Sequence, residues 1–132
     1  MAIPSGSGTE VLKRAYCSNF TSTTTYIDWA VADGETDAGN SSATATRVPA
    51  NVIITILGFI IIRWNGGAGT VTVKLEHASN DDIWLLRDYS IGGKSTFSWN
   101  DKMVLREGDE LSFYSAQDEN DCWINYIYQD WT

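Results

Sequence analysis

The sequence predicts an all-β protein, an antiparallel β-sandwich or jelly roll preceded by a short N-terminal arm. Clusters of Gly, Asn, Asp and Ser recur along the chain and mark turns about every ten residues. No amphipathic pattern of helical length appears between them. The run VIITILGFIII (52–62) consists mostly of β-branched residues, which favour strands. A chain of 132 residues is long enough for one domain with a hydrophobic core.

The first residues differ in composition from the rest of the chain. Ser5, Gly6, Ser7 and Gly8 are typical of a flexible linker, and the following TEVLKRA is long enough for only one helical turn, capped by Thr9. We therefore expect an arm over residues 1–14 and a β-sandwich domain over residues 15–132.

The apolar run 52–62 is the longest in the chain. As a helix it would span about 16 Å, roughly half of a bilayer's hydrocarbon core, so it predicts no membrane span. The β-branched residues predict a long strand with a bulge or bend at Gly58. One face should meet the core, and the other a second layer or a neighbouring subunit.

The remaining strands follow from alternation between turn clusters. Strands are expected at 26–32 and 43–48 before the long run, and a Gly-rich turn at 65–69 predicts a hairpin from that run into a strand at 70–76. Further strands are expected at 83–91, at 95–99, on both sides of the Glu107-Gly108-Asp109 turn, and at 122–131.

Charge and cysteine content narrow the class of protein. The net charge is −8 and the nine cations are scattered, which disfavours direct nucleic-acid binding. Cys17 and Cys122 match no metal-binding spacing, and the sequence leaves open whether they pair. The start of the chain lacks the apolar segment of a signal peptide, so we expect synthesis in a cytoplasm that keeps thiols reduced.

The chemistry-bearing residues show no catalytic pattern. The single histidine, His77, is expected at the exposed end of a strand, and no serine lies in a nucleophile motif. We therefore expect no enzymatic activity and no cofactor. Carboxylates gather in predicted turns, around residues 81–82, 107–110 and 118–121, where Asp is common for conformational reasons. Asp118 and Asp121 are the first candidates should a cation bind, although a solvated turn is favoured over a metal site.

Apolar residues exceed what a thin sandwich of this size can hide. Six Trp, six Tyr and four Phe accompany the long apolar run. The tryptophans are expected in a core or an interface rather than on a sugar-binding platform. A subunit interface would cover the excess, so we expect a homo-oligomer.

Two stretches resemble known proteins. MAIPSGSGTEVLKRA at the start and SIGGKSTFSWNDKMVLREGDELSFYSA with YIYQDW at the end resemble small virion structural proteins of tailed bacteriophages. The segment VLREGDELSF also resembles the entry to a late core strand in trimeric jelly rolls of the tumour-necrosis-factor type, with Leu105, Gly108, Asp109, Leu111 and Phe113 at the matching positions. There Gly108 allows a positive φ, Asp109 caps the turn, and Leu111 and Phe113 alternate into the core.

The resemblance implies a non-enzymatic virion protein, made in the host bacterial cytoplasm. The expected role is a capsid decoration or cement protein that forms a trimer and docks on the major capsid protein. The alternative is a small tail or fibre component that binds host glycans. The arm would lie along the partner and gain order on binding. The residues expected to contact this partner are Ile3, Pro4, Val11, Leu12, Lys13 and Arg14.

Overall fold

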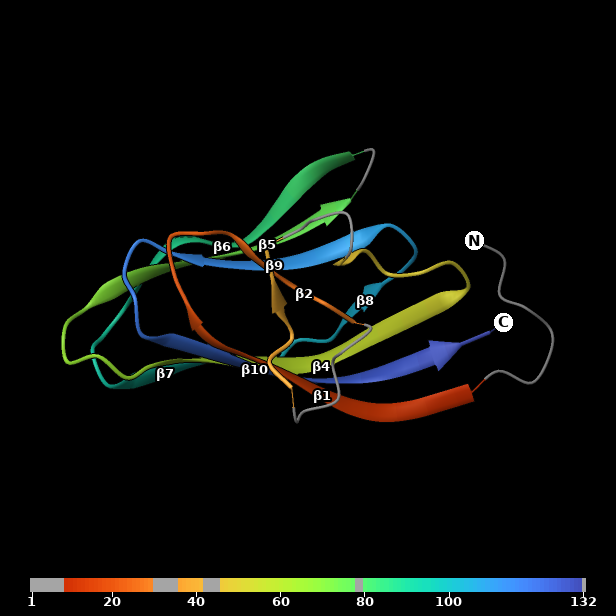
Figure 1. Ribbon diagram of the computed structural model, residues 1–132, viewed down its shortest axis with the longest axis horizontal. Helices are drawn as coiled ribbons and strands as arrows, with labels where there is room; N and C mark the ends of the chain where they lie inside the picture. The colour runs from red at the N-terminus through yellow and green to blue at the C-terminus, as the bar shows by residue number, and fades with distance from the viewer. Residues whose placement is uncertain (1–8, 30–35, 42–45, 78–79, 132) are drawn as a thin grey trace.

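In the computed structural model two antiparallel β-sheets pack face to face, which confirms the predicted all-β sandwich (Figure 1). The structure describes residues 9–29, 36–41, 46–77 and 80–131. Sheet A has the order β1 (Thr9–Phe20), β10 (Asn120–Asp130), β4 (Val52–Arg63) and β7 (Ser95–Trp99), and β8 (Met103–Leu105) also pairs with β4. Sheet B has the order β3 (Gly39–Asn40), β2 (Thr25–Ile27), β9 (Asp109–Ser115), β5 (Gly69–His77) and β6 (Asn80–Ile91).

The core lies between the sheets and follows from strand alternation. In β4 the residues from Val52 to Arg63 alternate between buried and half-buried, so one face meets the core and the other is only partly covered. The prediction of a long strand is confirmed, while the expectation of burial on both faces applies only in part. The largest fully buried side chains include Phe20, Ile27, Ile54, Ile56, Ile61, Leu105, Leu111, Phe113, Ile124 and Tyr126.

The predicted irregularity at Gly58 is a β-bulge. Asn125 of β10 pairs with Gly58, whereas the next residue, Tyr126, pairs with Ile56, so Leu57 is the extra residue. A Cβ atom on Gly58 would lie 2.8 Å from the main-chain oxygen of Trp99. Only glycine therefore allows the bulged strand and the end of β7 to approach this closely.

The predicted hairpin across the Gly-rich turn is wrong. Strands β4 and β5 lie in different sheets, and the segment between Arg63 and Gly69 crosses from one sheet to the other. Glycines predict a turn at this position. They do not indicate whether the strand after the turn pairs with the strand before it or joins the other sheet. Val71 and Val73 are buried against sheet A, as the alternation of β5 predicted.

Two expected strands are shorter than predicted. The strand expected at 26–32 ends at Ile27 in β2, and Trp29, although buried, lies in a turn. Of the strand expected at 43–48, residues 46–48 are not in a strand, and residues 43–45 lie outside the described residues. In this region Val48 exchanges backbone hydrogen bonds with Gly108 and Asp109, so the segment covers one end of sheet B instead of extending a sheet.

Strand β1 extends across the expected boundary at residue 14. Residues 9–14 form the first half of strand β1, paired with β10 from Thr9 opposite Asp130 to Arg14 opposite Asn125, and no helical turn forms there. Most of these residues are exposed, so their sequence does not show the alternation of apolar and polar residues that would predict a strand. Their strand conformation comes from the backbone of β10, which is remote in sequence. Residues 1–8 of the expected arm lie outside the described residues.

The tight turn before β9 agrees with the prediction in detail. Gly108 has a φ of 88°, and the Asp109 carboxylate accepts a hydrogen bond of 3.0 Å from the Arg106 backbone N–H. Leu111 and Phe113 are fully buried. Within the described ranges, no helix is long and apolar enough to span a membrane.

Candidate interaction surface

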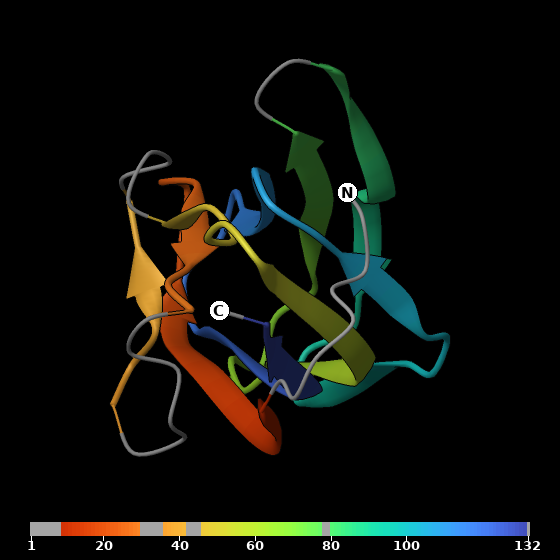
Figure 2. The same cartoon turned by 90° about the vertical axis from the view of Figure 1, so that its right-hand side faces the viewer.

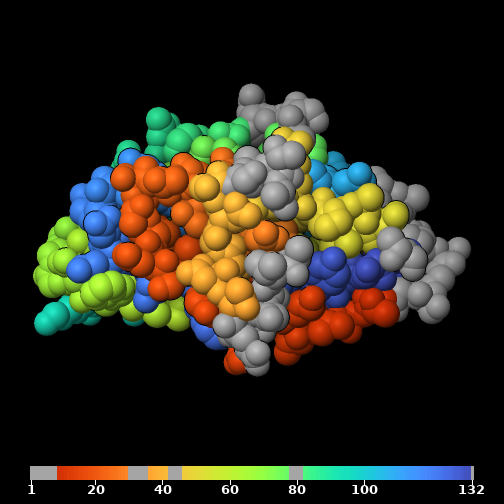
Figure 3. Space-filling model, in the orientation of Figure 1, coloured from red at the N-terminus to blue at the C-terminus, as the bar shows by residue number. Residues whose placement is uncertain are grey.

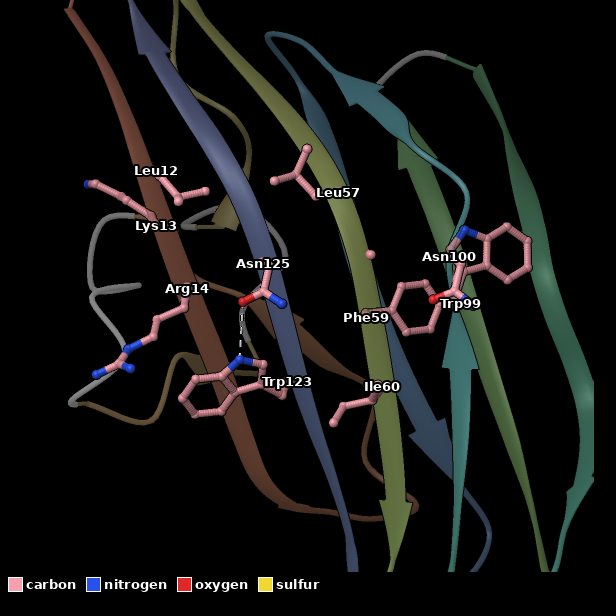
Figure 4. Close-up of a pocket in the computed structure, with 11 residues that line it drawn as sticks. Leu12, Lys13, Arg14, Leu57, Phe59, Ile60, Trp99, Asn100, Trp123 and Asn125 are labelled. Atoms are coloured by element: carbon pink, nitrogen blue, oxygen red, sulfur yellow. Dashed lines mark hydrogen bonds between the residues drawn. The ribbon is translucent and has the colours of Figure 1, made fainter.

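The outer face of sheet A carries an open, mostly apolar groove of about 770 Å³, termed here the sheet A groove (Figure 4). It extends across three neighbouring strands, β1, β10 and β4, and reaches the segment that follows β7. Its apolar lining consists of Leu12, Leu57, Phe59, Ile60, Trp99 and Trp123. The polar side chains at its margin are Lys13, Arg14, Asn100 and Asn125.

Local sequence explains why a hollow forms here. Strand pairing places Leu12 opposite Ile127 and Arg14 opposite Asn125, so alternate residues of β1 and β10 face outward. The bulge at Leu57 turns an additional apolar side chain to this face, while Gly58 contributes none. The floor is formed where the rings of Phe59 and Trp99 stack at 5.7 Å.

Trp123 contacts three neighbouring side chains that hold its ring in place. Its ring stacks on Tyr16 with a centroid separation of 6.0 Å, and the guanidinium carbon of Arg14 lies 5.4 Å from its centre. Its indole N–H donates to the Asn125 side-chain oxygen at 3.3 Å, as Figure 4 shows. Three neighbours thus fix the ring, which reduces the conformational entropy lost when a partner covers it.

Large apolar side chains remain exposed around this groove. Leu12 is 70% exposed and Val104 of β8 is 66% exposed. A contiguous exposed apolar patch on a soluble protein is typical of an interaction site. The outer face of sheet A therefore has the properties of a surface that another molecule covers.

Four of the six residues predicted to contact a partner lie together in β1, at the edge of this surface. Val11, Leu12, Lys13 and Arg14 are consecutive in β1, and three of them, Leu12 to Arg14, line the groove. The Lys13 ammonium lies 4.5 Å from the centre of the Tyr128 ring. Ile3 and Pro4 lie outside the described residues. The residues of β4, β10 and the β7 end were not predicted, because only the strand order brings them beside β1.

The outer face of sheet B carries a cluster of charges. Glu110 is directly opposite Glu76, and it is buried, although its segment was predicted to be a solvated turn. One Glu110 oxygen accepts from the Arg47 side chain at 2.9 Å, and within the described ranges the other has no hydrogen-bond partner. The Lys74 ammonium lies 2.9 Å from Glu76.

The titration of this cluster follows from its contacts. Burial, reinforced by the charge of Glu76 and a hydrogen bond to it, raises the pKa of the Tyr26 phenol. Burial lowers the pKa of Lys74, but the carboxylates of Glu76 and Asp82 outweigh it, and the pKa of Lys74 is raised overall. The Lys74 ammonium thus lies between two carboxylates, 2.9 Å from Glu76 and 3.3 Å from Asp82.

The residues that the sequence analysis considered for catalysis or cation binding form hydrogen bonds within the fold. The ring nitrogen Nδ1 of His77, at the end of β5, forms a close hydrogen bond with Asp109. The Asp121 carboxylate accepts from the Asn19 backbone N–H at 2.7 Å, and the Asp118 main-chain oxygen accepts from Arg63. In the described part of the chain, no three His, Cys, Asp or Glu side chains gather closely enough to hold a metal ion.

A buried arginine is the residue that sequence reasoning missed most clearly. Arg63 is 3% exposed at the end of β4, directly after the apolar run 52–62, and nothing in the sequence around it predicts this burial. Its guanidinium donates to the main-chain oxygens of Gly67 and Asp118, at 2.6 and 2.9 Å, and to the Asn120 side chain at 3.1 Å. It thereby joins the crossing between the sheets to the turn before β10.

The fold and this surface define an all-β sandwich protein with an exposed apolar groove. No family model and no curated protein matches the chain. A solved structure described as "Bacillus endospore appendages form a novel family of disulfide-linked pili" is similar, at 13% sequence identity and a TM-score of 0.49, over 100% of this chain and 97% of the other. A likeness of this degree leaves the function to be argued from the residues of this chain.

Proposed function

We propose that this protein is a non-enzymatic structural component of a bacteriophage virion, a capsid decoration or cement protein that forms a trimer and docks on the major capsid protein. The observation on which the proposal depends is the sheet A groove with its exposed apolar margin. A groove that presents Trp123, Ile60 and Leu12 to solvent is suited to a protein partner, because apolar and aromatic side chains dominate the energetics of interfaces.

The charges at the groove support a protein partner with an acidic surface. Lys13 and Arg14 lie at its margin, in a chain whose net charge is −8. Arg14 rests over the Trp123 ring on the groove side and so is held in place before a partner arrives. An acidic rim on the partner would meet this cation while apolar side chains fill the groove.

The first experiment measures self-association. The mass of the purified protein in solution should be that of an oligomer, and Ile60→Ser together with Trp123→Ser should shift it toward the monomer. Thr96→Ser, an exposed position on the neighbouring strand β7, is the matched control and should leave the mass unchanged. A wild-type monomer at all concentrations would contradict the proposal.

The second experiment locates the protein. In a culture that produces it, antibody labelling of purified phage particles should show many copies spread over the head. Removal of residues 2–8 should lower the occupancy of particles without unfolding the protein, since β1 begins at Thr9. Absence of label from every particle would refute the virion role.

The alternative is a tail or fibre component that binds host glycans. The feature that favours it is Trp64, 49% exposed beside the crossing between the sheets, because an exposed indole can stack on a sugar ring. Trp84 is also exposed, but Lys74 and Arg87 lie within 5.0 and 4.6 Å of its ring centre. Binding on a glycan array that Trp64→Ala abolishes, with label on tails and none on heads, would favour this function.

A further inference from the structure

Strand β1 is the edge of sheet A, and its two halves differ. On the edge that points away from β10, the second half of β1 already has hydrogen-bond partners. The Tyr16 main-chain oxygen accepts from the Ala38 N–H at 2.8 Å, and the Ser18 N–H donates to Asp37 at 3.0 Å. Along Thr9–Arg14, the described residues place no strand on that side. In Figure 3 the start of β1 (red) lies at the surface beside β10 (blue).

The alternation of the backbone identifies which main-chain groups of β1 point away from β10. Since Tyr16 and Ser18 direct their main-chain groups away from β10, the same strand period directs those of Glu10, Leu12 and Arg14 outward too. An unpaired row of N–H and C=O groups on an edge strand is a template for another strand.

We propose that a second copy of this chain pairs with this edge, β1 against β1 in antiparallel orientation, with Leu12 of both copies on the two-fold axis. This contact goes beyond the trimer proposed above: a two-fold contact closes at two copies, so it would join one copy from each of two trimers. Glu10 then lies opposite Arg14 of the second copy, and Arg14 opposite its Glu10. Three hydrogen-bonded residue pairs form, with about six backbone hydrogen bonds between them.

Charge complementarity selects this register. The side chains of Glu10 and Arg14 lie on the same face of β1 as Leu12, where Gln129 donates to Glu10 at 3.2 Å and Arg14 lies over Trp123. Opposite charges directly across a strand pair stabilise it, and like charges destabilise it. A shift of two residues in either direction separates Glu10 from Arg14.

The hydrogen bonds that Ala38 and Asp37 form with the second half of β1 favour the same register. If the register shifted so that Glu10 lay opposite Tyr16, the Tyr16 main-chain oxygen would have to accept a hydrogen bond from the second copy, but it already accepts one from Ala38. When the pairing is centred on Leu12, it ends at Arg14 and does not reach Tyr16. This pairing also buries the exposed apolar area of Leu12. It places Val11 beside Lys13 of the second copy, and the aliphatic part of that lysine covers Val11.

Charge reversal tests the register. The dissociation constant of the wild-type protein is measured by sedimentation equilibrium at about 0.15 M salt. Glu10→Arg and Arg14→Glu should each weaken pairing at least about tenfold, since each places like charges opposite one another. The double variant should restore wild-type association, because it exchanges the two charges across the axis.

A cysteine at the axis tests the geometry independently. Residues in a hydrogen-bonded antiparallel pair have Cα atoms about 5.5 Å apart, within the range that a disulfide spans. Leu12→Cys should therefore form a covalent dimer under mild oxidation. Ile83→Cys, at an exposed position on β6 of sheet B, is the matched control and should not. Circular dichroism checks that each variant folds.

The outcomes separate this inference from the proposed function. Restored association in the double variant together with the Leu12→Cys dimer supports edge pairing. Association that persists in both single variants, with no Leu12→Cys dimer, overturns edge pairing while self-association through the sheet A groove survives. A wild-type chain that remains monomeric overturns both.

Discussion

Cys17 of β1 lies directly opposite Cys122 of β10, and both are buried as free thiols against the core. The two strands are remote in sequence, so this contact depends on the pairing of the whole sheet. Burial, followed by the hydrogen bond to Cys17 and its charge, raises the pKa of the Cys122 thiol well above its ordinary value of 9.0.

This thiol makes stability depend on alkaline pH. The unfolded chain loses the Cys122 proton near pH 9 while the folded chain keeps it, so its contribution is fully present below that pH and is lost as pH rises. Above about pH 9, the free energy of unfolding should fall as pH rises, with a slope that grows toward about 1.4 kcal/mol per pH unit. Cys122→Ala should flatten this slope in urea titrations under reductant; an unchanged slope would contradict the prediction.

Arg63 should be essential for stability. Arg63→Leu leaves two main-chain oxygens and the Asn120 side chain without their donor, so we expect a loss of about 3 kcal/mol, because unsatisfied buried groups cost about 1–3 kcal/mol each. The exposed Arg106→Leu serves as the control and should change stability by less than about 0.5 kcal/mol. Chemical denaturation measures the free energy of unfolding of both variants. Equal losses would show that Arg63 does not hold the crossing segment and the turn before β10 together.

Gly58 should tolerate no side chain. In Gly58→Ala the new Cβ meets the main-chain oxygen of Trp99 at 2.8 Å, and because backbone cannot move aside as a flexible side chain can, we expect a loss of about 1–3 kcal/mol. Gly66→Ala, whose Cβ would lie 3.9 Å from its nearest neighbour, provides the matched comparison. Thermal unfolding should separate the two variants by several degrees; coincident transitions would mean that the bulge relaxes freely.

Gly108 should resist substitution for a conformational reason. Its φ of 88° is costly for a residue with a Cβ, so Gly108→Ala should destabilise the protein by about 1–2 kcal/mol. The effect should appear in urea unfolding without any change in self-association, since the turn lies away from the sheet A groove. A neutral substitution would imply that the turn between Arg106 and Asp109 adopts another type.

The sequence allowed most strands of the second half to be predicted, because local signals define them. Ser95–Trp99 and the turn at Gly108 are bounded by glycine and polar residues, and Leu111 and Phe113 alternate as a half-buried strand requires. The assignment of strands to sheets was harder. Val71 faces the core in either a hairpin or a crossing, so its alternation could not reveal that β5 belongs to the other sheet.

The candidate surface was predictable only along β1. The resemblance to virion proteins implies that Leu12 and the adjacent cations Lys13 and Arg14 contact a partner, and these residues lie in β1. Trp123 and Ile60 join them only through the order β1-β10-β4, which is a long-range property. The burial of Glu110 was equally hidden, because Arg47 and Glu76, which meet it in space, are far from it in the sequence.

The pairing of β1 with β10 also bears on timing. Glu10 and Gln129 touch across 119 positions of sequence, and in the described structure β10 is the only strand hydrogen-bonded to β1. Contacts of such separation form slowly, because a long loop must close first. On the ribosome, β1 emerges before β10, so β1 cannot form its pairing until β10 has been synthesised. Any assembly that uses the β1 edge can therefore begin only after translation of nearly the whole described chain, which protects the nascent polypeptide from premature association.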